Sequence, residues 1–339
     1  MNRLTMAVLA ASLLVPSALI TAARAESAAA PDNQPATIKE WLVPWPDSRP
    51  RDPYRAPDGS VWLVGQGDDY AARFNPDDES FQRFDLPPGT GPHNIIVAAD
   101  GAPWYAGNRN AHIGRLNPET GEITRFPTPE DQLKDPHTLI FADSGMLWFT
   151  SQWANHIGRL NPQNGAVEAV AVPTQKARPY GIVLDSDGQP WIALLGTNKL
   201  ATVDPATMSL TEIELPRADA RPRRLAVTSD DMIWYVDYQQ GYLGCYDPDS
   251  GDFREWRAPG KDRSGPYAMA ADNQGRLWFF ETWQQPNRLV GFDPRTESFF
   301  SLSDVPSGGG TVRHMVFDPR DNALWFGTDT NYLGKALLP

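Results

Sequence analysis

Short apolar runs alternate with turn segments along almost the whole chain. One representative stretch contains Ile95-Ile96-Val97, then Ala99-Asp100-Gly101, then Trp104-Tyr105-Ala106. Runs rich in Val, Ile, Phe, Trp and Tyr, separated by Gly, Pro, Asn and Asp, are typical of β-strands joined by tight turns. The pattern therefore predicts an all-β chain.

A tryptophan recurs at the same place in each repeat. The successive spacings are 42, 44, 43, 43, 44 and 47 residues, and the tryptophans are Trp62, Trp104, Trp148, Trp191, Trp234, Trp278 and Trp325. A third strand, an Asn-Pro or Asp-Pro turn and a fourth strand ending in proline follow most of them. Four strands in a period of roughly 40–45 residues is the pattern of a propeller blade. Helical repeats share such periods, but they would not tolerate 32 prolines.

The two ends of the chain are expected to complete one blade together. The last unit ends at residues 332–338 without a fourth strand of its own, whereas residues 38–44 carry the fourth-strand pattern before the first unit. Pairing them would close the ring and hide an exposed strand edge. We therefore predict a seven-bladed β-propeller of four-stranded antiparallel blades, closed by the N-terminal strand. The tryptophans are expected to pack between blades.

The first 25 residues have the features of a secretory signal peptide. Arg3 supplies a positive start, residues 4–20 are mostly apolar, and Ala23-Arg24-Ala25 forms a small-x-small cleavage site. The apolar run is short for a membrane anchor, and a polar tail follows it. We interpret residues 1–25 as a signal peptide, 26–36 as a polar linker and 37–339 as the propeller. This predicts a periplasmic or secreted protein with no membrane insertion.

Composition narrows the classes of partner. A formal net charge of −12 argues against a nucleic-acid-binding surface. With a single cysteine, Cys245, no intramolecular disulfide can form, and a chain of this length can stabilise itself by core burial. We expect a monomer that binds a small molecule.

Polar residues vary at one point of the repeat, where the first strand of each blade begins and should line the central channel. Six of these seven positions follow a proline. The constant proline followed by a varying Arg, His or Tyr indicates a functional rim, and its members are Arg51, His93, His137, Tyr180, Arg223, Tyr267 and Arg313.

A second set of positions lies three residues after each tryptophan and includes Asp237 and Glu281. Counting across the hairpin turn predicts that Glu281 lies opposite Tyr267 and that Asp237 lies opposite Arg223. Two carboxylates would then reach the channel mouth, and His314 can join them. The alternative for Arg223 and Asp237 is an ion pair that only holds the end of the hairpin.

Other histidines and tryptophans have less specific interpretations. His112 and His156 lie in the third strand, in a repeated motif away from the axis, and are expected to be structural. Trp153 and Trp283 could roof the pocket or pack against neighbouring loops.

The blade motif resembles a known family. Gly91-Pro92-His93, Asp135-Pro136-His137 and Leu277-Trp278-Phe279-Phe280-Glu281 are similar to the G-P-H…D-G…W-F-T-E pattern of the streptogramin B lyase (virginiamycin B lyase-like) propellers, over residues 37–339. The resemblance implies elimination from a cyclic depsipeptide. In that family a histidine at the start of a blade removes a proton next to the ester carbonyl, and a carboxylate-bound magnesium ion polarises that carbonyl.

This chain departs from that pattern at three positions. The resemblance assigns the magnesium-binding Glu to Glu281, but Tyr267 stands where the base His is expected. Gly265 stands where a second metal carboxylate is expected, and Arg223 replaces another functional His. Asp237 could supply the second carboxylate, and His93, His137 or His314 could serve as the base.

The resulting hypothesis is a metal-assisted lyase acting on a small cyclic or ester-containing compound at the channel mouth. Tyr267, Glu281 and His314 are the candidate catalytic residues, and Glu281 and Asp237 would hold a divalent cation, with Mg²⁺ favoured. The remaining members of the rim would bind substrate. The alternatives are a non-catalytic periplasmic ligand-binding propeller, a metal-dependent lactone hydrolase and a scaffold for protein partners.

Overall fold

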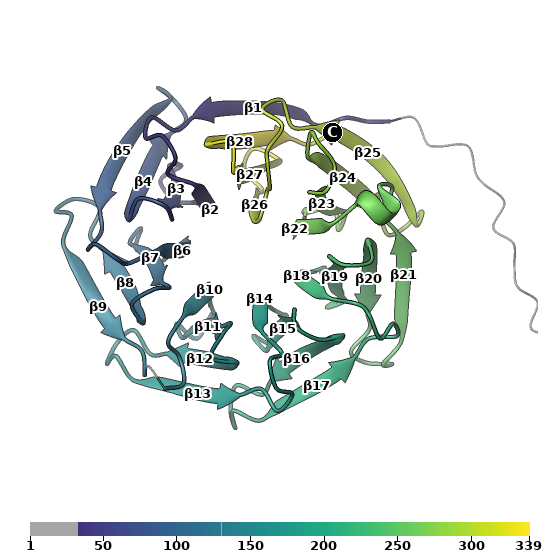
Figure 1. Cartoon of the computed structure of the whole chain (residues 1–339), viewed down its shortest axis with the longest axis horizontal. Helices are drawn as coiled ribbons and strands as arrows, with labels where there is room; N and C mark the ends of the chain where they lie inside the picture. Colours follow the sequence, from purple (N-terminus) through teal and green to yellow (C-terminus); the bar gives the residue numbers. More distant parts are fainter. Residues whose placement is uncertain (1–32, 130) are drawn as a thin grey trace, which may run out of the picture.

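Seven four-stranded sheets arranged around a central axis make up the computed structural model, which describes residues 33–129 and 131–339 (Figure 1). Each sheet is antiparallel and forms one blade, with its first strand nearest the axis and its fourth strand at the rim. The prediction of an all-β, seven-bladed propeller is confirmed. The predicted signal peptide, residues 1–25, lies outside the described residues.

The strands occupy equivalent places in the seven blades. The first strands are β2 (Pro50–Arg55), β6 (Pro92–Val97), β10 (Pro136–Phe141), β14 (Pro179–Leu184), β18 (Pro222–Val227), β22 (Pro266–Ala271) and β26 (Met315–Asp318). The second strands are β3 (Val61–Gly65), β7 (Pro103–Gly107), β11 (Leu147–Ser151), β15 (Pro190–Leu194), β19 (Ile233–Asp237), β23 (Leu277–Glu281) and β27 (Ala323–Gly327).

The outer strands complete each blade. The third strands are β4 (Tyr70–Asn75), β8 (His112–Leu116), β12 (His156–Leu160), β16 (Lys199–Val203), β20 (Tyr242–Tyr246), β24 (Arg288–Asp293) and β28 (Tyr332–Leu337). The fourth strands are β5 (Ser80–Asp85), β9 (Ile123–Pro127), β13 (Val167–Ala171), β17 (Leu210–Glu214), β21 (Phe253–Arg257), β25 (Ser298–Asp304) and β1 (Thr37–Leu42). One short 3₁₀ helix, Lys261–Arg263, precedes β22.

Ring closure follows the prediction from the repeat. β1 pairs antiparallel with β28, so that the N-terminal strand becomes the fourth strand of the last blade. Trp41 of β1 stacks on Trp325 of β27, with ring centroids 5.6 Å apart. The two ends of the chain are thereby held by hydrogen bonds and by aromatic packing.

The core lies between blades. All seven repeat tryptophans are buried, and each packs with apolar residues of its own and of an adjacent blade. Trp325, for example, contributes to a cluster with Leu63 and Tyr70 of the first blade. The second strands are buried on both faces, whereas the fourth strands alternate between half-buried and exposed residues. This gradient is expected when only the outer strand borders solvent.

A glycine in the third strand makes room for an aromatic residue of the second strand. A Cβ on Gly114 or Gly158 would come within 2.1 Å or 2.3 Å of the ring of Tyr105 or Phe149, its partner across the ladder. The Ile-Gly-Arg-Leu motif is therefore a packing motif, with glycine required by the facing ring.

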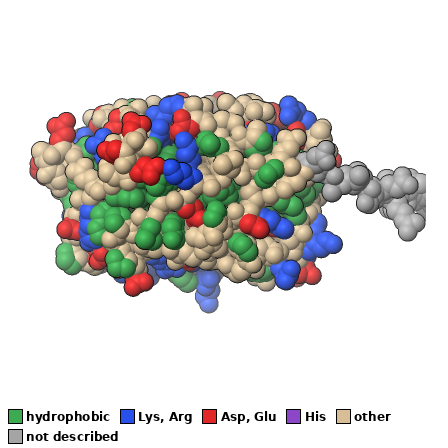
Figure 2. Space-filling view, turned by 90° about the horizontal axis from the view of Figure 1, so that it is seen from above, with side chains coloured by type: hydrophobic (Ala, Val, Ile, Leu, Met, Phe, Trp, Pro, Cys, Tyr) green, Lys and Arg blue, Asp and Glu red, His purple; other side chains and the backbone are tan. Residues whose placement is uncertain are grey.

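Seen edge-on, the molecule is a flat disc whose outer wall mixes acidic, basic and apolar side chains (Figure 2). The first strands all begin at one face of this disc, which we call the start face. The turns that connect first to second strands lie at the opposite face, which we call the turn face. Among the described residues, no helix is long and apolar enough to cross a membrane.

Candidate functional site

The seven residues predicted to form a rim lie together at the start-face end of the channel. Six of them are the second residue of a first strand, and Arg313 lies just before β26, so the ring brings their side chains towards one axis. We call this set the start-face cluster, and it consists of Arg51, His93, His137, Tyr180, Arg223, Tyr267 and Arg313.

Aromatic rings of the cluster pack against one another across blade boundaries. The rings of His93 and His137 lie with centroids 3.6 Å apart, and His137 and Tyr180 lie 4.2 Å apart. All three side chains are buried, as is Tyr267. This end of the channel is therefore filled by side chains from neighbouring blades.

Two phenols and a guanidinium group form the centre of the cluster. The hydroxyl groups of Tyr180 and Tyr267 are hydrogen-bonded to each other across the channel. Arg223 lies between their blades in the chain, and its Nη2 donates a hydrogen bond to the Tyr267 hydroxyl at 3.0 Å. The same guanidinium group stacks 3.7 Å from the centroid of Tyr267 and 4.1 Å from that of Tyr238.

The arginines make Tyr180 unusually acidic. Burial raises its pKa, but the charges of Arg223, Arg224 and Arg51 and the hydrogen bond with Tyr267 lower the pKa further, to about 7. The pKa of Tyr267 is raised by burial and by the negative charge of Tyr180. The two hydroxyl groups thus titrate as a pair, and near neutral pH the pair can hold one proton rather than two.

The histidines of the cluster are held in their neutral form. Burial, followed by the positive charges of neighbouring arginines, holds the pKa of His93 and of His137 well below the usual range. Both imidazoles are therefore neutral at pH 7, and neither adds positive charge to the cluster.

Beneath the cluster, a layer of polar side chains crosses the channel, and we call Asp52, Asn94, Thr138 and Arg224 the polar septum. Arg224 donates to Thr138 Oγ1 at 3.1 Å and to the Arg313 carbonyl at 3.2 Å, and its Nη2 lies 3.4 Å from Asp52 Oδ2. Asn94 Nδ2 donates to the same Asp52 oxygen at 3.0 Å. The septum connects the first, second, third, fifth and last blades.

Positive charge exceeds negative charge in this part of the molecule. Arg51 and Arg224 share one carboxylate, Asp52, whose pKa burial raises but His314, both arginines and Asn94 together lower. Arg223 forms no ion pair within the described part of the chain. Three guanidinium groups therefore face a single carboxylate, while Arg313 is paired with Asp329 at 2.5 Å.

The predicted pairing of Tyr267 with Glu281 and of Arg223 with Asp237 is wrong. A β-bulge at the start of the first strand shifts the register by one residue, so Glu281 lies opposite Pro266 and Asp237 lies opposite Pro222. A bulge of this kind occurs in six of the first strands. Counting across the turn could not reveal it.

Both carboxylates are instead held by other arginines. Glu281 Oε2 accepts hydrogen bonds from Arg288 Nε at 2.9 Å and Nη2 at 2.5 Å. Asp237 Oδ2 accepts from Arg217 at 2.8 Å. The expected Arg223–Asp237 ion pair is thus made by Arg217.

The residues as arranged do not fit a divalent cation at Glu281 and Asp237. The other oxygen of Glu281 accepts from the backbone N–H of Gly260 at 2.5 Å, and Asp237 Oδ1 accepts from the backbone N–H groups of residues 221, 239 and 240. Both side chains are fully buried. A cation would have to displace an arginine and several hydrogen bonds, since each carboxylate already has its charge neutralised and both oxygens bonded.

A tryptophan explains the glycine at the position where the resemblance places a second metal carboxylate. Gly265 has a φ of +50°, and a Cβ there would come within 2.4 Å of the Trp283 indole. Trp283 is 41% exposed, and its Nε1 donates to the Tyr238 hydroxyl at 3.0 Å. Because Tyr238 packs edge-on against Tyr267, Trp283 borders the start-face cluster.

The remaining candidates lie elsewhere. His314 lines the cavity on the turn face together with Asn94, Thr138 and Arg224 of the septum, and it lies close enough to Asp52 to lower the pKa of that carboxyl. His112 is buried in the third strand against Tyr105 and Arg125, away from the axis, in agreement with a structural role. Trp153 is exposed and lies against Arg178, whose guanidinium carbon is 4.5 Å from the ring centroid.

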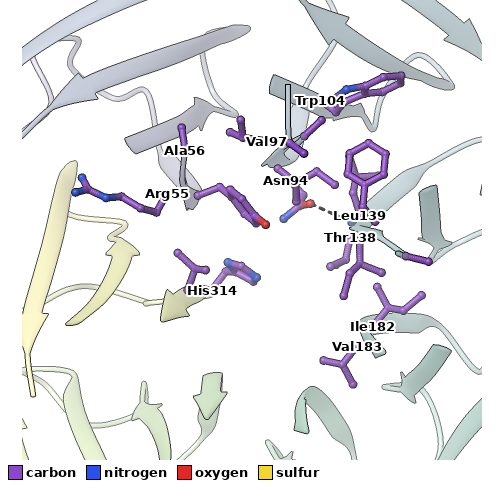
Figure 3. Close-up of a pocket in the computed structure, with 18 of the residues that line it drawn as sticks. Arg55, Ala56, Asn94, Val97, Trp104, Thr138, Leu139, Ile182, Val183 and His314 are labelled. Atoms are coloured by element: carbon purple, nitrogen blue, oxygen red, sulfur yellow. Dashed lines mark hydrogen bonds between the residues drawn. The ribbon is translucent and has the colours of Figure 1, made fainter. Parts of the chain in front are cut away.

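The turn-face end of the channel is open. A cavity of about 1260 Å³ is lined there by the ends of all seven first strands and by the turns after them (Figure 3). Val97, Leu139, Ile182 and Val183 form part of its apolar wall, and His314 lies on the opposite side. Asn94 and Thr138 of the septum form part of its floor.

Sequence reasoning missed Asp52 and Arg224, which hold the septum together. Their signal was present, because consecutive charged residues, Arg51-Asp52 and Arg223-Arg224, stand at the start of the first strands, next to the channel axis. Charged residues are rarely buried unless they are paired, so such doublets mark side chains with partners across the channel.

The comparisons with known proteins place this arrangement in a family. Residues 36–336 match the model of the Virginiamycin B lyase family. No curated protein matches the chain. A structure of virginiamycin B lyase from Staphylococcus aureus aligns with a TM-score of 0.81 at 22% identity, over 90% of this chain and 100% of that chain.

Two further structures show how far the similarity extends. A streptogramin B lyase structure gives a TM-score of 0.81 at 23% identity, over 90% of this chain and 98% of that one. The WD40 propeller domain of Doa1 gives 0.72 at 13% identity, over 89% and 96% of the two chains. At these identities the structural likeness demonstrates the fold, and the family assignment rests on the match to the family model.

Proposed function

Because the chain belongs to the virginiamycin B lyase family, we propose that it is a lyase acting on a small cyclic or ester-containing molecule at the start-face end of the channel. The observation that carries this proposal is the contact between Arg223 and the phenol pair Tyr180–Tyr267. The resemblance places the family's base at Tyr267, and the structure brings Tyr180 into hydrogen-bonding contact with it. A phenolate shared by the two residues would take the place of a histidine base.

The acid–base chemistry is suited to neutral pH. A general base works best when its pKa lies near the pH at which it operates, and the pKa of Tyr180 is lowered to about 7. The neutral His137 packs against Tyr180, and His93 packs against His137, so this pair of imidazoles can orient the Tyr180 ring.

In the proposed elimination, the phenolate removes a proton from a carbon that lies between a carbonyl group and the carbon that bears the ester oxygen. The electron pair of that C–H bond forms a carbon–carbon double bond, and the C–O bond on the next carbon breaks with its electron pair going to the leaving oxygen. Negative charge develops on the carbonyl oxygen during this step. The guanidinium groups of Arg223 and Arg51 would stabilise that charge, because fixed donors are most effective where charge develops.

A magnesium-dependent version of this reaction finds no support in the arrangement of Glu281 and Asp237, whose oxygens are all hydrogen-bonded. A metal-dependent lactone hydrolase meets the same objection. The proposed elimination therefore includes no step that requires a metal ion.

Ligand capture without catalysis is the second candidate. It is favoured by the complete burial of Tyr267 and the near-complete burial of His137, because a substrate must reach the phenols past Arg223 and Tyr238. A binding protein needs no such access to the phenols.

The proposal is tested by incubating the protein with cyclic depsipeptides of the streptogramin B type, including quinupristin, which is bound in one structure of an inactive virginiamycin B lyase variant. Elimination opens a ring without changing its mass and creates an absorbing double bond, whereas hydrolysis adds one water. Tyr180→Phe should lower kcat/KM by about 100-fold or more. Tyr246→Phe, in the outer part of the fifth blade, should leave it unchanged. Binding without any product would favour capture.

Export is a separate part of the proposal and rests on the pattern of residues 1–25 alone. Sequencing the N-terminus of the protein purified from the periplasm or the medium should find Glu26 as the first residue. An intact Met1 in all fractions would contradict it.

A further inference from the structure

We infer that the start-face cluster recognises a molecule that carries one carboxylate and an apolar body, with arginines supplying the positive charge of the site. The inference uses the site of the proposed function and names its ligand class, but it does not require that the site catalyse a reaction.

Charge balance is the first argument. Arg51, Arg223 and Arg224 have one carboxylate, Asp52, as an ion-pair partner within the described residues, so two of the three guanidinium charges have no carboxylate of their own. A phenolate on the Tyr180–Tyr267 pair neutralises one of them. One carboxylate of a ligand would neutralise the other, and buried charges are stable only when they are paired. A ligand with two carboxylates would leave a negative excess.

Unpartnered donors are the second argument. Arg51 is 6% exposed, its Nη1 donates to Gln66 at 2.8 Å and its Nε faces Asp52 Oδ1 at 3.7 Å, but its Nη2 finds no hydrogen-bond partner in the described structure. Arg223 Nε and His93 Nδ1 are buried without a partner in the same way. Such atoms are rare because a buried donor that finds no acceptor has lost its hydrogen bonds to water without replacing them. Carboxylate oxygens are the acceptors that guanidinium groups bind best.

Tyr238 and Trp283 supply a surface that can contact the apolar part of the ligand. Tyr238 and Trp283 lie edge to face at the mouth, with ring centroids 5.1 Å apart, and Tyr238 continues into the cluster through Tyr267. Arg223 and Arg313, both partly exposed, lie over the Tyr267 ring. A ligand could therefore place its carboxylate on the guanidinium groups and its apolar body against the exposed face of Trp283.

The test uses small probes of matched shape and different charge. Benzoate should raise the Tm of the protein at constant ionic strength, neutral benzamide should not, and the dicarboxylate phthalate should bind at least about 10-fold more weakly than benzoate. Arg51→Gln and Arg223→Gln should each weaken benzoate binding by about 10-fold or more. Arg115→Gln, which breaks an exposed ion pair with Asp100, is the matched control and should bind as wild type does.

A second readout follows the phenols directly. The absorbance of tyrosinate near ~295 nm should show a transition near neutral pH that Tyr180→Phe removes. The groups facing Tyr180 are Arg51, Arg223, Arg224, His137 and Tyr267. Bound benzoate adds negative charge among them, so it should move this transition to higher pH, and by linkage benzoate should bind more weakly at high pH.

Two outcomes would overturn the inference. One is that benzoate and benzamide raise the Tm equally, or that neither of them raises it. The other is stabilisation by Mg²⁺ or Mn²⁺ that EDTA reverses and Glu281→Gln abolishes, because a cation would then occupy the site. Elimination activity together with no response to carboxylates would retain the proposed function and reject the ligand class. Benzoate binding without elimination activity would retain the ligand class and reject the proposed function.

Discussion

The two ends of the channel are built from the same seven strands and differ in almost every physical respect. At the start face, the cluster and the septum fill the axis with arginines, phenols and imidazoles, most of them buried. At the turn face, the last residues of the same strands enclose an open cavity of about 1260 Å³ with largely apolar walls. Within one strand the fold is carried by the residues that repeat from blade to blade, and the chemistry by the residues that do not.

The largest expected effect comes from breaking the septum. Arg224→Met leaves the buried Asp52 carboxylate with Arg51, at 3.7 Å, as its remaining ion-pair partner and removes the cross-channel hydrogen bonds of Arg224, which should cost about 3 kcal/mol of unfolding free energy. Urea unfolding measures this loss. Arg224→Lys keeps a positive charge beside Asp52 and should lose less stability than Arg224→Met. If Arg224→Met unfolds at the wild-type midpoint, the septum does not hold the start-face end together.

The second-largest effect is expected from acid, which should lower the free energy of unfolding through the histidines of the start-face cluster. His93 and His137 have lowered pKa values in the folded protein, so they stay neutral while the unfolded chain takes up protons below about pH 6.5. Stability is therefore complete above that pH and should fall as the pH decreases, by about 1.4 kcal/mol per histidine per pH unit. Thermal unfolding between pH 7 and pH 5 measures the slope. In the His93→Gln variant the slope should be shallower, and an unchanged slope would assign it to other groups.

A carboxylate at position 265, where the family resemblance expects one, should also destabilise the folded protein. Gly265→Asp combines the cost of a side chain at positive φ with a collision against Trp283, together about 2–3 kcal/mol. Gly101→Asp is the matched control, because Gly101 has a φ of +84° and open space around it. Gly101→Asp should cost only the free energy of placing a side chain at positive φ, about 1 kcal/mol. Equal losses of Tm in the two variants would show that the indole yields easily.

The smallest effect is expected at the turn face. Val183→Phe adds volume inside the open cavity, where the new ring meets space rather than packed side chains, so its free energy of unfolding should stay within about 0.5 kcal/mol of the wild-type value. The tyrosinate transition should not move. A loss as large as that of Gly265→Asp would mean that the two ends are equally well packed.

The repeat made the fold predictable. The spacing of the tryptophans, the prolines at the strand starts and the fourth-strand pattern before the first unit were enough to predict seven blades and the closure by β1. The same repeat located all seven members of the start-face cluster. Each of these features depends on local sequence or on a comparison between equivalent positions.

Partners across space could not be predicted in the same way. The bulge after Pro266 moves Glu281 away from Tyr267, and the arginines that hold Glu281 and Asp237 come from a third strand and from a loop between blades. Nothing in the local pattern distinguishes Arg217 from Arg223 as the partner of Asp237. The metal hypothesis followed from residue types alone, whereas the hydrogen bonds of those carboxylates depend on the whole ring.

The closure of the ring has a consequence for the order of folding. Thr37 pairs with Leu337, three hundred positions later in the chain. During synthesis, the first six blades can form one after another from local hairpins, but β1, the outer strand of the last blade, has no partner until β28 has emerged. Contacts this distant in sequence are slow to form, because their loop must close before they stabilise anything. The joining of β1 to β28 should therefore come last, and until then β1, which is synthesised first and has no partner, should be the part of the nascent chain most open to pairing with the wrong strand.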